Sequence, residues 1–314
     1  MKTLLTLTCG LSLLMMACET EQTKNDFQAQ TAAYKVNDTA FKDYWYQGKA
    51  ELNTYEISQN RYNDLHPGEV IAIFVTEDFL TDKQVKNDSY KNPNSVSILK
   101  TNLINRFTTG LYDYSIMTST FTPVDVNQNP YTLKVTTSAQ DWCGQAWMQI
   151  NKSKQGYDMQ LNSYFENEAD KKGKAPNTFL EDEIMNKIRI NPAILPTGET
   201  TMIASNQFLR LTHQAFAPTK VVASLKNYEG SDFEGKNLQV YNIKMPEYQR
   251  DLSFIFEGEA PFQIAGWMDT YPSAFDKKPR TSVAKRKQTL MEPYWKLNNK
   301  SDRAKRTDLG IEGI

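Results

Sequence analysis

The sequence predicts a mainly β protein: a large curved antiparallel sheet, an open barrel or two packed sheets, with one central helix. Segments rich in β-branched and aromatic residues follow one another along the chain, and turn-forming residues separate them at hairpin distance. Connections that short join antiparallel neighbours, because parallel strands need long crossovers. About a dozen strands rarely remain in one flat sheet, so we expect the sheet to curl or to divide into two packed layers.

The first eighteen residues form a segment of their own. Lys2 is followed by an apolar run over 4–16, which ends in Ala17-Cys18. The run is too short to cross a bilayer stably, and a small residue followed by cysteine is the pattern that a lipoprotein signal peptidase cuts. We therefore predict that 1–17 is a signal peptide and that acylated Cys18 attaches the mature chain to the outer membrane, facing the periplasm or the cell surface.

After the signal, a polar segment leads to the folded part. Residues 18–37 are rich in Gln, Thr, Asn and Asp, and they predict a flexible tether. A single β-rich domain is expected over 38–314. Asp38 and Thr39 are good caps for a short helix near 38–45.

The first series of strands follows that helix. Strands are predicted over 49–57, 69–76, 95–107, 114–126, 131–138, 146–151 and 157–165. Turn chemistry separates them, at His66-Pro67-Gly68, Asn92-Pro93-Asn94, Asn127 to Pro130 and Lys154-Gln155-Gly156.

One helix, over about 178–190, interrupts the strands. Thr178 and Glu181 have the spacing of a capping box, and Asn191-Pro192 ends the apolar stripe that follows. Strands then resume over 200–211, 220–225, 238–245, 252–257, 262–271 and 281–294, and a short helix near 301–309 closes the chain.

Cysteine and histidine are too few for several kinds of site. The mature chain keeps Cys18, which we assign to lipid, and Cys143, so an intramolecular disulfide is not expected. Two histidines and one free cysteine do not supply four ligands for structural zinc, and no EF-hand, phosphate-binding glycine loop, GxSxG or HExxH pattern is present. We expect no metal and no cofactor.

Two hypotheses of catalysis remain open. Cys143 is a candidate nucleophile with His213 as its base, although free cysteines are more often buried packing residues. A pair of carboxylates facing each other would also suit an envelope hydrolase. The candidates for that pair are Glu166, Glu168, Asp170, Glu181, Asp182, Glu183, Glu257 and Glu259.

Charge and aromatic residues are relevant to binding. From Lys277 to Arg306 there are eleven basic and two acidic residues, a stretch that suits either anionic headgroups or a solvated strand whose lysines prevent edge pairing. Aromatic residues such as Trp142, Trp147 and Trp267 are spread over the chain, and on a curled sheet they would form a core or line an apolar ligand site. Nucleic acid is not an expected partner of an exported chain.

The chain resembles a family of predicted lipoproteins from Bacteroidota. The resemblance is carried by Tyr44 to Glu51, Phe74 to Phe79, Ser119 to Val124, Asp141 to Gly144, Asn162 to Glu166 and Leu195 to Gly198. Members of that family often bear the label "septum formation inhibitor Maf". Maf proteins are cytoplasmic nucleotide pyrophosphatases with a Ser-Pro-Arg-Arg motif that this chain lacks, so we expect no Maf activity. The expected function is binding of an apolar ligand, lipid, glycan or envelope protein.

Overall fold

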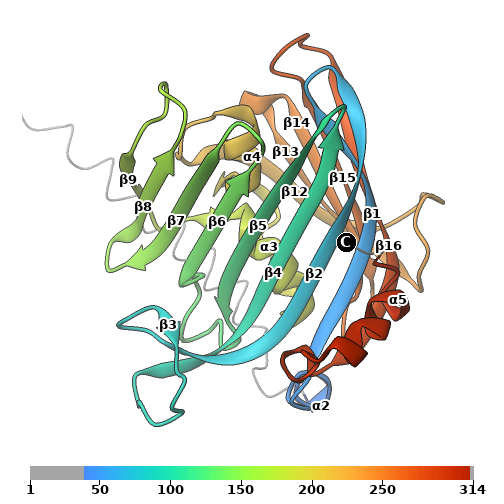
Figure 1. The fold of residues 1–314 in the computed structure, drawn as a ribbon. Helices are drawn as coiled ribbons and strands as arrows, with labels where there is room; N and C mark the ends of the chain where they lie inside the picture. Colours follow the sequence, from blue (N-terminus) through green and yellow to red (C-terminus); the bar gives the residue numbers. More distant parts are fainter. Residues whose placement is uncertain (1–38, 312–314) are drawn as a thin grey trace, which may run out of the picture.

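The computed structural model describes residues 39–311, and its main feature is one strongly curved sheet that does not close into a barrel (Figure 1). The strands are β1 (Ala50–Arg61), β2 (Asp64–Leu80), β3 (Val85–Lys86), β4 (Ser95–Thr109), β5 (Tyr112–Pro123), β6 (Lys134–Gln140), β7 (Gln145–Ser153), β8 (Gly156–Ser163), β9 (Lys171–Pro176), β10 (Phe179–Leu180), β11 (Gly198–Ile203), β12 (Thr219–Asn227), β13 (Leu238–Met245), β14 (Arg250–Glu257), β15 (Ile264–Pro272) and β16 (Pro279–Glu292). The α-helices are α2 (Thr39–Trp45), α3 (Ile184–Ile190), α4 (Asn206–Thr212) and α5 (Ala304–Asp308). The predicted fold class is confirmed.

The strand order explains where the sheet stays open. The order is β10-β11-β12-β13-β14-β15-β16-β1-β2-β4-β5-β6-β7-β8-β9, and β3 pairs with β2. All pairs are antiparallel except β10 with β11. The two edges, β9 and β10, are consecutive in the chain and are joined only by Asn177 and Thr178. We call the gap between these edges the seam.

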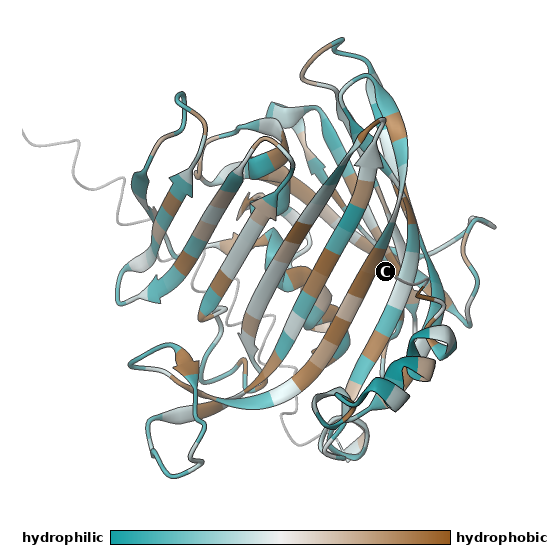
Figure 2. Cartoon of the chain, viewed as in Figure 1, coloured by the Kyte–Doolittle hydropathy of each residue, from teal (hydrophilic) through white to brown (hydrophobic). Residues whose placement is uncertain are grey.

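Alternation of side chains gives the sheet two different faces (Figure 2). On β5, Tyr114, Ile116, Thr118 and Thr120 are buried, whereas the residues between them are more exposed. This is the period-2 pattern of a strand with one buried face. The buried threonines make part of the concave face polar.

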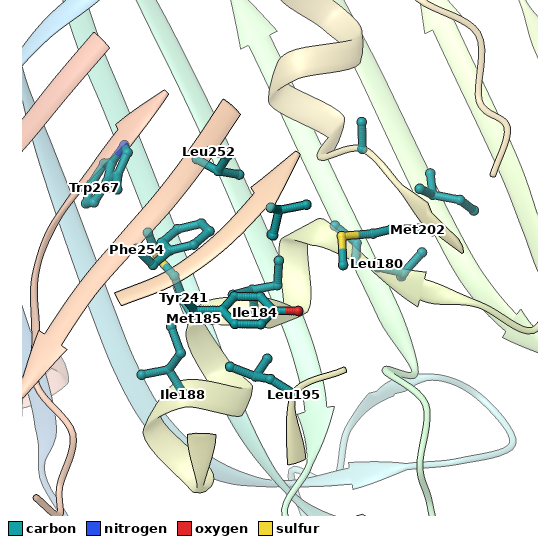
Figure 3. Close-up of a cluster of buried hydrophobic side chains, with 14 of the residues drawn as sticks. Leu180, Ile184, Met185, Ile188, Leu195, Met202, Tyr241, Leu252, Phe254 and Trp267 are labelled. Atoms are coloured by element: carbon teal, nitrogen blue, oxygen red, sulfur yellow. The ribbon is translucent and has the colours of Figure 1, made fainter. Parts of the chain in front are cut away.

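Helix α3 fills the middle of the concave face. Its side chains Ile184, Met185 and Ile188 lie among apolar residues of β13 to β15, including Phe254 and Trp267 (Figure 3). This packing removes the middle of the inner face from water. The interior beside α3 is therefore a packed core rather than an open channel.

A buried ion pair attaches α3 to the sheet. Arg189 makes two hydrogen bonds to the Glu51 carboxylate, one of them 2.6 Å long from Nη2 to Oε2, and both side chains are fully buried. Although burial opposes ionisation of Glu51, the adjacent guanidinium holds its pKa below the ordinary value. Removing either partner would leave a buried charge without compensation.

The convex face is covered at one end by the last helix. Leu309 and Ile311, which follow α5, pack against Leu52, Ile71 and Ile73 of β1 and β2. The predicted short helices near 38–45 and 301–309 correspond to α2 and to a 3-10 turn over Lys300–Arg303 followed by α5. The predicted signal peptide 1–17 and tether 18–37, with Cys18, lie outside the described residues.

Two predicted elements were wrong in part. The helix over 178–190 is shorter, because Phe179–Leu180 pairs with Met202–Ile203 as a strand, and the Thr178 hydroxyl donates to the Thr201 carbonyl instead of capping a helix. A 3-10 turn over Glu181–Glu183 then leads into α3.

The predicted strand over 200–211 ends at Ile203, and α4 follows it. Ser205 caps α4 by accepting a hydrogen bond from the Phe208 N–H, at 3.3 Å. His66-Pro67-Gly68 was predicted as a turn but lies inside β2. Proline is tolerated there because the pairing of β2 with β4 begins only at Gly68, so Pro67 has a strand neighbour on one side alone.

Candidate functional site

A groove of about 660 Å³ opens beside the seam. The concave faces of β7, β8 and β9 form its floor. Helix α4 and the segment that follows it form one side. Figure 1 shows α4 beside these strands, at one end of the curved sheet. Its volume lies within the range of small-molecule sites, about 300–1,000 Å³.

The floor of the groove is apolar. Met148 of β7 lies opposite Leu161 of β8, and Met159 lies two residues before Leu161 on the same face. Phe165 and Phe216 add aromatic surface from the two loops at the sides. Methionine and phenylalanine together form a surface that adapts to apolar ligands of irregular shape.

Gly173 of β9 lets the two sides of the groove approach each other. A Cβ atom at this position would lie 2.9 Å from Met159 Cε and 3.5 Å from Phe216 Cδ1. A larger residue would therefore push the methionine or the phenylalanine away. Because Gly173 has no side chain, Met159 of β8 and Phe216 after α4 can both pack close to the backbone of β9.

One wall of the groove is a charged cluster of Arg210, Glu168 and His213. Arg210 Nη1 donates to Glu168 Oε1 at 2.8 Å, and Nη2 donates to the other carboxylate oxygen. The Nδ1 atom of His213 lies 2.7 Å from Glu168 Oε1, and the Ser163 hydroxyl donates to Glu168 Oε2. His213 is the C-cap of α4, with φ +56°, so the end of the helix sets its position.

Glu168 remains ionised in this cluster. Its burial opposes ionisation, but hydrogen bonds from Arg210, Ser163 and His213 outweigh that effect and lower its pKa to about 2. The carboxylate therefore compensates Arg210 over the ordinary pH range. The pair fixes the end of α4 to the loop between β8 and β9.

A second, smaller cavity lies on the other side of α4. Its volume is about 80 Å³, and Phe208 and Leu211 of α4 line it together with Asp182, Asn105 and Trp267. Helix α4 thus separates the groove from the cavity. About 80 Å³ is enough for several water molecules but is well below the size of an ordinary ligand site.

The cavity is lined by one cation, Arg250, and three carboxylates, Glu181, Asp182 and Asp269. Arg250 donates to both oxygens of Glu181 and to both oxygens of Asp269, at 2.6 to 2.9 Å. Asp182 is left without a cation of its own and accepts a hydrogen bond from the Asn206 N–H at 3.0 Å. Burial raises the pKa of Asp182 to about 7, and repulsion from Glu181 acts in the same direction.

The candidate carboxylates are mostly engaged in ion pairs or hydrogen bonds. The Oε1 atom of Glu183 lies 2.9 Å from Lys187 Nζ. Glu257 forms an ion pair with Arg286, and Glu259 accepts a hydrogen bond from Asn237. Glu166 and Asp170 are exposed. Glu181 and Asp182 are the two candidates that share a cavity within residues 39–311, and at about 80 Å³ that cavity is too small for a sugar ring.

Cys143 and His213 are not brought together as a catalytic pair. Cys143 is exposed in the turn between β6 and β7, so the expectation that it packs in the core was wrong. The turn is held by the Asp141 side chain, which accepts a hydrogen bond from the Cys143 N–H. His213 instead contacts Glu168 and the ring of Phe165.

The aromatic residues divide between core and surface. Trp45 and Trp267 are buried, whereas Trp142 and Tyr164 are each 67% exposed. The Tyr164 ring lies against Gly144, which is in the same turn as Trp142. The two exposed rings therefore belong to neighbouring turns. Sequence pattern did not separate these two groups.

Residues 39–311 contain neither a metal-ligand cluster nor a membrane-spanning helix. No cluster of three or more potential metal ligands is found there. Within the same range, no helix has the length and apolar character needed to span a bilayer. Of the basic residues between Lys277 and Arg306, Arg280, Arg286 and Lys305 form ion pairs with acidic side chains.

The seam groove was not predicted from sequence, although two of its residues were. His213 and Glu168 were candidates in separate hypotheses, and the structure joins them to each other. Lys171, Lys172, Arg210 and Gly173 were missed, because their significance depends on β9 lying against the segment after α4.

Comparison with known proteins gives little further information. No protein-family model matches the chain. No curated protein matches it either. Among solved structures, the chain is similar to a β-barrel-like protein of domain of unknown function DUF1849 from Brucella abortus, at 11% sequence identity and a TM-score of 0.39, over 77% of this chain and 98% of that one. The likeness is too slight to carry an argument about function.

Proposed function

We propose that this protein is an envelope lipoprotein, anchored by acylated Cys18, that binds a molecule with an apolar chain in the seam groove. The observation that carries the binding role is the groove itself, about 660 Å³ in volume with a floor of Met148, Met159 and Leu161. Burial of a chain on such a floor is favourable by about 0.8 kcal/mol per methylene. The signal-like first eighteen residues and the family resemblance support the placement in the envelope.

The groove is a better site for such a ligand than the inner core. Helix α3 occupies the middle of the concave face, and the cavity beside α4 is only about 80 Å³. The groove, in contrast, opens at the seam, where the sheet has no further strand to cover β9. A ligand can therefore reach it without unfolding of the core.

Native mass spectrometry of the full, acylated chain released from detergent tests this proposal. The chain is titrated with two twelve-carbon molecules, monododecanoylglycerol and dodecanoate. We expect one equivalent of at least one of them to bind. The variant Phe216→Ser should lose that binding, because it removes a ring from the side of the groove.

The matched control is Phe275→Ser, which removes an exposed phenylalanine from the hairpin between β15 and β16. It should bind as the unchanged protein does. The proposal fails if neither molecule binds, or if Phe216→Ser binds as tightly as Phe275→Ser. Thermal unfolding of both variants shows whether either has lost its fold.

A further inference from the structure

The groove floor ends at a lysine. Lys171 and Lys172 begin β9, and in the sheet they lie opposite Leu161 and Gln160 of β8. Because successive side chains of a strand point to opposite faces, Lys171 shares the groove face of Leu161, whereas Lys172 shares the exposed face of Gln160. Glu168 is the single carboxylate among the lining residues, and Arg210 compensates its charge. The apolar floor therefore ends at a positively charged lip formed by Lys171.

The two lysines are not neutralised within the described part of the chain. Lys171 Nζ donates to the Asn167 carbonyl at 3.0 Å, and neither Lys171 nor Lys172 forms an ion pair there. Lys174 on the same strand differs, because its Nζ lies 3.6 Å from an Asp158 carboxylate oxygen. Glu168 is not available to the lysines, since Arg210, Ser163 and His213 already occupy its oxygens.

Arg210 does not add to the charge of the lip. Its side chain is 6% exposed, and both of its terminal nitrogens donate to Glu168. Its Nε atom has no hydrogen-bond partner among residues 39–311, but that atom has almost no accessible surface, so a ligand in the groove cannot reach it. Lys171 is therefore the cation that a headgroup at the lip would meet.

We propose that the seam groove selects an amphiphile with an anionic headgroup, which Lys171 holds at the lip while the apolar chain lies on the methionine floor. This inference rests on the proposed function and specifies its ligand. The headgroup chemistry is an anionic oxygen, either a carboxylate or a phosphate. A free anion would use the lip alone, whereas an amphiphile uses the lip and the floor together.

The test compares ligands that share a twelve-carbon chain and differ in headgroup. The full acylated chain is titrated in native mass spectrometry with dodecanoate, dodecyl phosphate, monododecanoylglycerol and dodecyltrimethylammonium. We expect the anionic ligands to bind about threefold more tightly than the neutral one, and the cationic one to bind least tightly. Tighter binding of dodecyl phosphate than of dodecanoate would assign a phosphate headgroup, and the reverse a carboxylate.

Variants of the lysines identify the origin of the preference. Lys171→Gln should remove the preference for anionic heads, while monododecanoylglycerol still binds. Lys172→Gln is the matched control, because it removes the same charge from the other face of β9, and it should retain the preference. Both positions are exposed, so the fold should persist.

Each outcome separates this inference from the proposed function. If no twelve-carbon ligand binds, the proposed function fails. If all headgroups bind equally, or the preference persists in Lys171→Gln, only the inference fails. Inorganic phosphate is a further arm: if it binds as tightly as dodecyl phosphate, the lip is a site for free anions and the amphiphile inference is overturned.

Discussion

Replacing Asp182 with asparagine is expected to make the protein more stable, and increasingly so as the pH rises. Asp182 lines the cavity beside α4, and burial raises its pKa to about 7 even though the Asn206 N–H donates to it. Asparagine keeps an oxygen that can accept this hydrogen bond, but it never carries the charge. The substitution therefore removes the cost of an ionised carboxylate and little else.

The sign and size follow from proton linkage. The pKa of the carboxyl in the unfolded chain is near its ordinary value of 3.8, so between about pH 4 and pH 7 the folded state holds a proton that the unfolded state has released. The free energy of unfolding consequently falls as the pH rises through this window, and it levels off above it. Between pH 5 and pH 7 the free energy of unfolding falls by 1.36 kcal/mol per pH unit, which is about 3 kcal/mol in all.

Urea unfolding of the purified protein at pH 5 and pH 8, followed by tryptophan fluorescence, measures this effect. The advantage of Asp182→Asn over the unchanged protein should grow by about 3 kcal/mol from pH 5 to pH 8. Asp88→Asn, at an exposed loop position, is the control and should show the same difference from the unchanged protein at both values. A constant or shrinking advantage for Asp182→Asn would refute the reasoning.

Two further predictions concern the groove and the turn beside it. Glu168→Gln should destabilise the protein by about 3–5 kcal/mol at pH 7, because it leaves the buried Arg210 without a counter-charge. The lowered pKa of Glu168 means that the unchanged protein loses this stabilisation as the pH falls from about 4.5 to about 2, so urea unfolding should show the two proteins converging in that range. If the unfolding free energies of the two proteins do not converge in that range, Glu168 is not the counter-charge of Arg210. Cys143 is exposed, so a thiol reagent should label the native protein about as fast as the urea-unfolded one, and slow labelling of the native form would show that the turn is covered.

Most strands could be predicted because their signals are local. The range 238–245 coincides with β13, and Lys154-Gln155-Gly156 lies at the turn between β7 and β8. Alternating burial and turn residues are properties of neighbouring positions, so a single sequence contains them.

The error over 200–211 has a different origin. Residues 200–203 do form a strand, but the next turn of chain becomes α4 because distant groups stabilise it. Glu181 accepts a hydrogen bond from the Ser205 N–H, and Glu168 binds Arg210 near the other end of the helix. These contacts join residues between 24 and 42 positions apart, and no local pattern shows them.

The site was predictable only as separate residues. His213 was recognised as a polar candidate, yet its partner is Glu168 rather than Cys143, because the loop between β8 and β9 folds against the end of α4. Lys171 and Lys172 gave only the signal of a charged edge strand. The proposed role of Lys171 at the lip depends on its register with Leu161, which the sheet alone establishes.

The sequence by itself determined the β-rich class of this protein, the alternation of its strands and the short helices near its two ends, because backbone propensity and side-chain period act between near neighbours. Only the tertiary structure decided where the sheet stays open, and that choice creates the groove. The two edge strands are consecutive in the chain, and the seam between them exists because the first and last long strands, β1 and β16, pair with each other. That pairing joins residues more than 200 positions apart, and its energy comes from packing and hydrogen bonds that form only when the whole sheet is assembled.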